Sequence, residues 1–158
     1  MSLHLDDLTI NISNLDFADL REAWEWLICD MTEVIIISKF GDMFLKGGDG
    51  SIYWLDTAGG SLTKIAGNRV EFDSVLQEDD NINEWFLPHL IEELEESGQL
   101  LAKNQVYSFV MPPAIGGEYA AGNVKATDLS VHFAFTGQIL EQIKDLPDGT
   151  KVKIKLVE

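Results

Sequence analysis

The chain has 158 residues and carries 27 Asp and Glu against 11 Lys and Arg, which gives a formal net charge of −16. A chain of this length usually forms one domain, and an apolar fraction of 46% supplies enough hydrophobic surface for a core, so disorder is excluded. The charge also argues against a protein that binds bare nucleic acid or an anionic membrane, because each phosphate would be repelled.

The start of the chain and its cysteine content predict a cytosolic protein. Residues Met1–Asp7 lack the basic and apolar regions of a signal peptide. No apolar stretch approaches the ~20 residues that a transmembrane helix requires. Cys29 is the only cysteine, so an internal disulfide is excluded and an oxidising compartment is not implied.

The first part of the chain predicts one helix followed by an antiparallel meander. Asp16 is placed to cap a helix whose apolar residues recur every three or four positions as far as Ile28. The β-branched run Val34–Ile37 predicts a central strand that is covered on both faces. Further strands are expected at Met43–Leu45, Ser51–Asp56 and Leu62–Ala66, separated by glycine-rich turns.

Helical periodicity returns between residues 70 and 101. It predicts a short amphipathic helix and then a longer one that begins at Asn81 or Asn83. Pro88 is expected near the first turn of the longer helix, where a missing N–H costs little. Gly98 is a plausible residue for its C-terminal cap.

The last third of the chain predicts more strands and one further helix. Asn104–Met111 is typical of a strand, and a glycine-rich loop follows through Asn123. The segment Leu129–Ile143 fits both periodicities, and we expect a strand that becomes a helix near Thr136. Lys151–Leu156 alternates as an edge strand would. These elements together predict a single α+β domain over residues 1–158, with helices packed on an antiparallel meander sheet.

The charges are unevenly distributed along the chain. The 33 residues between Arg69 and Lys103 contain no Lys or Arg and ten acids, so this segment accounts for −10 of the total −16. One interpretation is a solvated helix face that keeps the protein soluble. The other is an acidic surface that meets a basic partner and accelerates association with it.

Other chemistry-bearing residues favour structural interpretations. His132 lies between two apolar residues and is expected to be a buried, hydrogen-bonded histidine, and Cys29 is expected to pack in the core. The glycine clusters match no phosphate-binding motif, and the acids lack the spacing of a calcium loop. The sequence therefore predicts no metal, no cofactor and no catalytic residue. Trp26 lies off the apolar stripe of its helix and is a candidate exposed contact residue.

Five short motifs in order resemble one bacterial family. They are Gly41–Leu45, Ile52–Thr57, Pro112–Tyr119, Val131–Phe133 with Gly137–Ile139, and Lys144–Thr150. The family, once a domain of unknown function, is the C-terminal domain of type VI secretion immunity proteins that protect against DNase effectors. The resemblance extends from about Leu15 to the C-terminus. It implies an α+β domain of the bacterial cytosol that binds and neutralises a toxin, and it carries over no catalytic residue.

Two function classes follow as the main alternatives. The first is a non-enzymatic immunity factor that occludes a toxin. Its candidate partner-binding residues are Glu78, Asp79, Asp80, Glu92, Glu93, Glu95, Glu96, Glu118 and Tyr119. Its partner would be a basic nuclease domain, with no direct contact to nucleic acid or membrane. The second is a small-molecule or regulatory ligand-binding domain that uses the loop around Gly116 as a pocket rim. An enzyme is a third class, which would require titratable groups that converge in a cleft.

Overall fold

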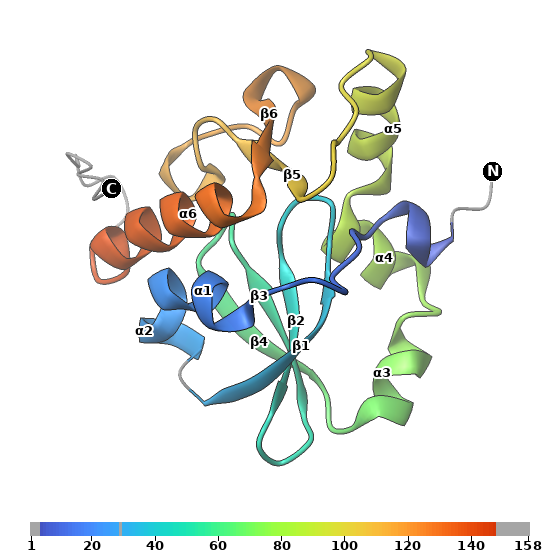
Figure 1. Cartoon of the computed structure of the whole chain (residues 1–158), viewed down its shortest axis with the longest axis vertical. Coiled ribbons are helices and arrows are strands. Elements are labelled where there is room, and N and C mark those ends of the chain that lie inside the picture. The colour runs from blue at the N-terminus through green and yellow to red at the C-terminus, as the bar shows by residue number, and fades with distance from the viewer. Residues whose placement is uncertain (1–3, 29, 148–158) are drawn as a thin grey trace.

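Four consecutive strands form the centre of the molecule and pair antiparallel in chain order (Figure 1). The computed structural model describes residues 4–28 and 30–147. The strands are β1 (Met31–Ile37), β2 (Met43–Gly47), β3 (Ile52–Asp56) and β4 (Ser61–Ala66). Phe44 of β2 lies opposite Trp54 of β3, and the turns between strands are short, as the glycine-rich breaks predicted.

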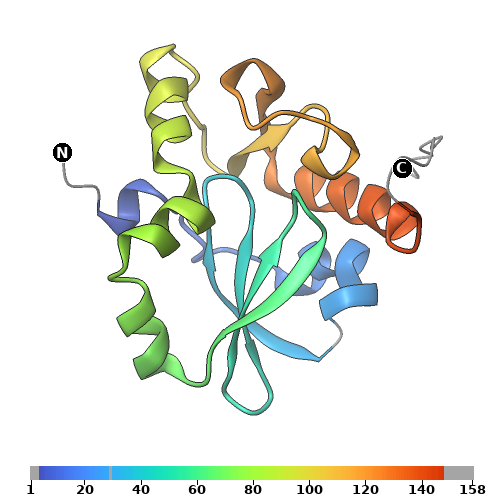
Figure 2. The ribbon, with the colours of Figure 1, turned by 180° about the vertical axis from the view of Figure 1, so that it is seen from behind.

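Helices cover both faces of this sheet (Figures 1 and 2). One layer consists of α3 (Arg69–Val75), α4 (Asp79–Phe86) and α5 (Pro88–Glu96), and the other of α1 (Phe17–Arg21), α2 (Glu25–Ile28) and α6 (Leu129–Ile143). Side chains alternate along β2, so that Phe44 joins the α3–α5 core while Met43 and Leu45 join the α1–α2–α6 core. The α+β meander with packed helices is confirmed.

A second, two-stranded sheet lies beside one end of the meander. It pairs β5 (Gln105–Phe109) with β6 (Val124–Asp128). Short 3₁₀ turns complete the chain at Leu5–Asp7, Glu22–Trp24 (η2), Pro113–Ile115 and Ala121–Asn123 (η4). No helix in the described part of the chain is long and apolar enough to cross a bilayer.

The expectation that Val34–Ile37 is a central strand is wrong. It belongs to β1 at the edge of the sheet, and residues 34–36 are only half-buried. The strand covered on both faces is β2, in which Met43, Phe44 and Leu45 are all fully buried. A run of β-branched residues indicates a strand, but its length says nothing about the position of that strand within the sheet.

The long helix expected after residue 81 is two helices. Leu87 takes a left-handed conformation with φ of 51°, which ends α4, and Pro88 then occupies the first position of α5. A proline there loses no intrahelical hydrogen bond, so the placement of Pro88 in a first turn is confirmed. Gly98 lies just past the end of α5 with φ of +88°.

The expected strand at Leu129–Phe135 is also wrong. Residues 129–143 form one continuous helix, α6, and the strand is instead β6, directly before it. Leu129, Phe133 and Thr136 are buried at helical spacing, whereas Val131 is 53% exposed. Apolar residues at positions 129, 131, 133 and 135 imitate strand alternation, and the exposure of Val131 together with the burial of His132 and Thr136 distinguishes the helical period.

The first helix is confirmed, although it is interrupted by η2. The Asp16 carboxylate accepts a hydrogen bond from the Asp19 backbone N–H at 3.3 Å, and Trp24 and Ile28 are fully buried. Trp26 is half-buried and stacks on Trp24 at 5.2 Å between ring centroids. Cys29 and the predicted strand Lys151–Leu156 lie outside the described residues.

Close packing of α6 against η2 predicts a sensitive glycine. A Cβ atom at Gly137 would lie 2.5 Å from the Ala23 backbone oxygen. Because backbone atoms cannot move aside cheaply, we expect Gly137→Ala to lower the free energy of unfolding by about 1–3 kcal/mol. Urea denaturation checks this value. Ala134→Gly, at a half-buried position of the same helix, should cost only about 1 kcal/mol from helix propensity, and equal losses for the two variants would contradict the packing explanation.

Candidate partner-binding surface

The acidic residues lie on the outer side of α3, α4 and α5 because the apolar residues of these helices face the sheet. Phe72, Trp85 and Phe86 surround Phe44 of β2, with ring centroids 5.3–5.6 Å from it. Ile91 and Leu94 of α5 belong to the same core. The amphipathic pattern therefore orients the carboxylates of this layer toward solvent.

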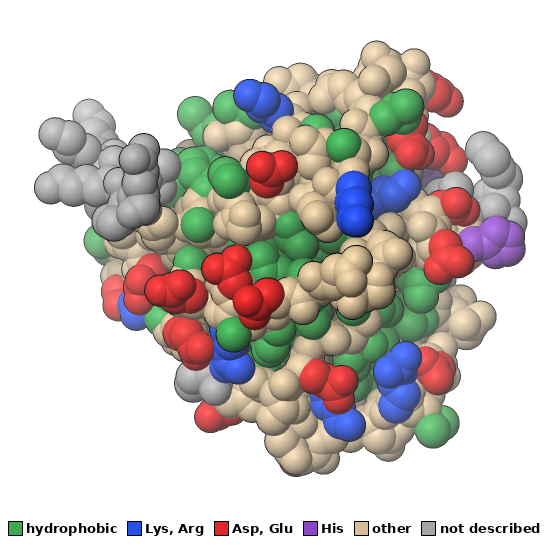
Figure 3. Space-filling model, viewed as in Figure 1, with side chains coloured by type: hydrophobic (Ala, Val, Ile, Leu, Met, Phe, Trp, Pro, Cys, Tyr) green, Lys and Arg blue, Asp and Glu red, His purple; other side chains and the backbone are tan. Residues whose placement is uncertain are grey.

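The structure places most of the predicted acids on this outer side. Six of them are exposed and Glu92 is half-buried; the exposed ones are Glu78, Asp79, Asp80, Glu93, Glu95 and Glu96. Among these seven acids, the described residues give an ion pair only to Glu95, whose carboxylate lies 3.4 Å from Lys39 Nζ. In Figure 3, acidic side chains gather at the margin beside α5 and again over α1 and α2. We call the outer side of α3–α5 the acidic face.

The remaining two predicted residues, Glu118 and Tyr119, lie on a loop that is hydrogen-bonded across its base. Asn123 accepts a hydrogen bond from the Met111 N–H and donates to the carbonyl oxygens of Met111 and Glu118, each at 2.9 Å. Gly117 packs so closely on the Met111 carbonyl that a Cβ there would overlap it. The η4 turn at the end of the loop lies against α5, so the loop adjoins the helix layer that carries the acidic face.

Tyr119 lies in the field of carboxylates from the meander. Its ring packs edge-on against Phe109 at 5.1 Å, and burial together with the charges of Asp56 and Asp42 raises its pKa. Burial also raises the pKa of Asp56, and the nearby carboxylate of Glu84 adds to the rise. None of the ion pairs among the described residues involves Asp56, Glu84 or Glu118. The Asp56 carboxylate accepts hydrogen bonds from the Ala58 and Gly59 N–H groups, and its turn meets the loop where the Ala114 N–H donates to the Ala58 carbonyl oxygen. Acidic side chains without an ion-pair partner among the described residues therefore lie beside this loop.

A buried chain of hydrogen bonds connects three of the sequence motifs with β5. Ser108 Oγ lies 2.9 Å from His132 Nδ1, and His132 Nε2 lies 3.1 Å from Thr57 Oγ1. Thr57 donates to the same oxygen of Asp42 through its hydroxyl at 2.7 Å and its backbone N–H at 2.9 Å. All four side chains are at most 7% exposed. The prediction that His132 is a buried structural histidine is confirmed.

The directions of the hydrogen bonds at Thr57 and Ser108 determine the tautomer of His132. Because the Thr57 hydroxyl gives its proton to Asp42, its oxygen accepts from His132 Nε2–H, and Nδ1 accepts from Ser108. Burial lowers the pKa of His132 to about 4, against a smaller opposing effect of a hydrogen bond with the Gly41 backbone. Burial, followed by repulsion from Asp56, raises the pKa of Asp42. His132 is thus neutral at pH 7.

This hydrogen-bonded chain has no room beside it for a substrate. The cavity next to Thr57 and His132 measures about 10 Å³, roughly the space that one water needs. The same cavity touches Pro112 and Pro113 at the start of the loop around Gly116. A pocket rimmed by that loop, as the ligand-binding alternative requires, therefore gains no support there.

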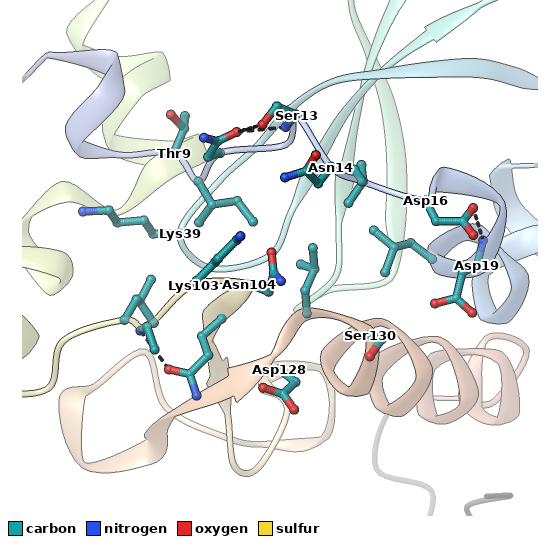
Figure 4. Close-up of a pocket in the computed structure, with 18 of the residues that line it drawn as sticks. Thr9, Ser13, Asn14, Asp16, Asp19, Lys39, Lys103, Asn104, Asp128 and Ser130 are labelled. Atoms are coloured by element: carbon teal, nitrogen blue, oxygen red, sulfur yellow. Dashed lines mark hydrogen bonds between the residues drawn. The ribbon is translucent and has the colours of Figure 1, made fainter.

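A much larger cleft lies elsewhere, between the N-terminal segment, the α5–β5 connection and the start of α6 (Figure 4). Its volume is about 970 Å³, and its apolar lining includes Ile10, Leu20 and Leu129. Lys103 extends into it, while Asp16 and Asp19 lie at the other end beside α1. No Trp or Phe lines this open and mixed surface, unlike the pocket that the ligand-binding alternative predicts.

Sequence analysis missed the residues that reach the candidate surface only through tertiary structure and belong to no local sequence pattern. Asp42 and Asp56 are distant from the acidic segment along the chain and join its surroundings only through the β2–β3 pairing. Met111 and Asn123 give no motif signal, since a side-chain amide that bridges two strands of a loop has no fixed spacing. Within residues 4–28 and 30–147, no three His, Cys, Asp or Glu side chains are arranged to hold a metal ion.

Comparison with protein families identifies the segment that carries the acidic face and the loop. Residues 66–140 match the family model described as T6SS immunity protein Tdi1, C-terminal. This confirms the resemblance indicated by the motifs at Pro112–Tyr119 and Val131–Ile139, which lie inside the match. The motifs at Gly41–Leu45, Ile52–Thr57 and Lys144–Thr150 lie outside it, so the match is narrower than the motifs indicated. No curated protein matches the chain.

Proposed function

Taking residues 66–140 as a segment of the T6SS immunity protein Tdi1 C-terminal family, we propose that the chain is a non-enzymatic immunity factor. It binds a toxin delivered by a type VI secretion system and covers the surface through which the toxin acts. The protein works in the bacterial cytosol, where such a toxin would meet its target. Neutralisation requires tight binding alone, so no bond is made or broken in the toxin or in the immunity factor.

The observation that carries this proposal is the acidic face. The matched segment contains the whole stretch between Arg69 and Lys103, which has ten acids and no Lys or Arg. Most of its predicted contact acids are exposed and unpaired among the described residues. Such a surface attracts a basic partner over a distance and raises the association rate.

The toxin that fits this surface best is a nuclease. A nuclease holds phosphates with Lys and Arg, and an inhibitor can occupy that surface with carboxylates in place of phosphates. The same charge would repel nucleic acid itself and an anionic membrane, so the proposed partner is the toxin protein alone. The buried Ser108–His132–Thr57–Asp42 chain supports a binding role rather than catalysis, because its hydroxyls and imidazole are all occupied by one another.

Charge reversal tests the acidic face. We expect the quadruple variant with Lys at positions 92, 93, 95 and 96 (each Glu→Lys) to bind the toxin domain of the cognate type VI effector with an association rate lowered about 10- to 100-fold at low salt. The difference should shrink at high salt because screening weakens exposed charges. Stopped-flow or surface-based kinetics at two salt concentrations measure it.

A matched control separates local charge from total charge. Glu22, Asp30, Glu141 and Asp145 are exposed and lie on or beside the opposite helix layer. Their reversal to Lys shifts the net charge from −16 to −8, the same change as in the test variant. Equal effects of the two variants would show that only total charge matters, and an unchanged affinity of the test variant would rule out the acidic face as the docking surface.

A further inference from the structure

Three large apolar side chains are exposed on or beside the loop that Asn123 holds. Val110 is 63% exposed, Met111 52% and Tyr119 55%. The described part of the chain buries most of its other large hydrophobic residues, so this concentration on one short loop is unusual. Met and Tyr are also the residue types that supply contact area at the centres of protein interfaces.

The backbone that carries these side chains is fixed before any partner arrives. Because one amide nitrogen of Asn123 donates to the carbonyls of both Met111 and Glu118, the two arms of the loop lie side by side. The close contact of Gly117 with the Met111 carbonyl leaves no space for the arms to slide. Binding through such a loop loses little conformational entropy, which increases the affinity that a given contact area yields.

The chemistry next to the loop defines what would fit it. The Ala114 N–H of the loop donates to the Ala58 carbonyl oxygen at 3.2 Å, and the Ala58 N–H donates to the Asp56 carboxylate at 3.1 Å, so the loop is joined to the turn that carries Asp56. Burial and then the charges of Asp56 and Asp42 raise the pKa of Tyr119, and Glu84 contributes to the raised pKa of Asp56. No Lys or Arg of the described residues forms an ion pair with Asp56, Glu84 or Glu118. A guanidinium or ammonium group from another protein would stack on the Tyr119 ring and neutralise these carboxylates.

We propose that this loop is the anchor of the toxin interface. Met111 and Tyr119 become buried at its centre, and Asp56 and Glu84 receive an Arg or Lys side chain of the toxin. The inference rests on the proposed function and assigns different rate constants to its two surfaces. The acidic face governs how fast the toxin arrives, since exposed charges act on association, whereas the loop governs how long the toxin stays.

The test uses the toxin domain of the cognate type VI effector and measures both the association and the dissociation rate constant. We expect Tyr119→Ala and Met111→Ala each to raise the dissociation rate about 10- to 100-fold, with the association rate within about threefold of the wild type. Asn123→Asp keeps the acceptor for the Met111 N–H but removes both donated hydrogen bonds. It should raise the dissociation rate about 10-fold without deleting either apolar side chain.

Two controls show whether the effect belongs to this loop. Val131→Ala removes a comparably exposed side chain from α6, and Leu100→Ala removes a 66% exposed side chain that lines the large cleft. Both should leave the dissociation rate unchanged. Urea midpoints equal to the wild type establish that Tyr119→Ala and Met111→Ala remain folded.

The outcomes distinguish the two proposals. If the wild type binds the toxin and Tyr119→Ala dissociates no faster than Val131→Ala, the anchor is wrong while the proposed function stands. If Leu100→Ala dissociates faster and Tyr119→Ala does not, the anchor lies in the large cleft instead. If the wild type itself fails to bind, the proposed function falls and the anchor falls with it.

Discussion

Phe44→Ala should lower the free energy of unfolding by about 3–5 kcal/mol, the range found for large aromatic truncations in tightly packed cores. Phe44 is fully buried in the most covered strand and contacts the rings of Phe72, Trp85 and Phe86. The cavity left behind cannot collapse easily, because two helices and the sheet meet there. Since a domain of this size is stabilised by only about 5–15 kcal/mol, the variant would lie close to unfolding at room temperature.

Urea denaturation followed by tryptophan fluorescence measures this loss, and Trp85 beside Phe44 provides a local probe. Val70→Ala is a suitable control because Val70 lies on the neighbouring α3 and is 80% exposed. Its effect should stay within about 0.5 kcal/mol. A Phe44→Ala loss of that same small size would mean that α3 and α4 are held to the sheet by other contacts.

His132→Phe should lower the free energy of unfolding by about 2–4 kcal/mol at pH 7. The imidazole is 2% exposed and satisfies both Ser108 and Thr57. A phenyl ring of similar size offers neither an acceptor for Ser108 nor a donor for Thr57, and leaving buried polar groups unpaired is costly. Ser108→Ala combined with His132→Phe removes one of these unpaired groups and should recover part of the loss, as a coupled pair does.

The same histidine predicts a distinctive pH dependence. Its folded pKa of about 4 lies below the usual 6.5, so the neutral form is the one that stabilises the fold. That contribution is complete above pH 6.5 and is lost as the pH falls from 6.5 to 4, by roughly 3 kcal/mol. Asp42 acts in the opposite direction, because its raised pKa favours protonation in the folded state as the pH falls.

Comparing the wild type with His132→Phe isolates the histidine from Asp42. Denaturation at pH 7, 5.5 and 4 should show that the stability advantage of the wild type over the variant shrinks as the pH falls. Repulsion from Asp56 also raises the pKa of Asp42, so a third arm with Asp56→Asn should flatten the rise in stability that Asp42 contributes. An advantage that stays constant from pH 7 to pH 4 would be incompatible with a buried, neutral imidazole.

The sequence predicted the elements whose signals are local. Asp16 as a cap, Pro88 in a first turn and the glycine breaks between strands each depend on a few neighbouring residues. The errors at Val34–Ile37 and Leu129–Phe135 concern properties that tertiary packing decides: the position of a strand in its sheet, and which of two overlapping periods faces the core.

The candidate surface also has one part that local sequence signals predict and one part that depends on tertiary packing. The acidic face could be predicted from the sequence because its acids lie in one continuous segment of the chain, and the apolar residues between them recur with a helical period. The loop held by Asn123 is not, since Met111 and Glu118 are brought together by a side chain that has no sequence signature. Asp56 belongs to the meander and the loop connects β5 with β6, so the packing of the two sheets is what brings them together.

The buried hydrogen-bonded chain joins two parts of the sequence that the family match separates. Ser108 and His132 lie within residues 66–140, whereas Asp42 and Thr57 precede them. An expression fragment trimmed to the matched residues would therefore leave the His132 Nε2–H without its acceptor, Thr57 Oγ1, and would remove the sheet on which the aromatic rings of α3 and α4 pack. A chimera that carries a relative's toxin specificity therefore has to take the meander and the matched segment from the same parent protein.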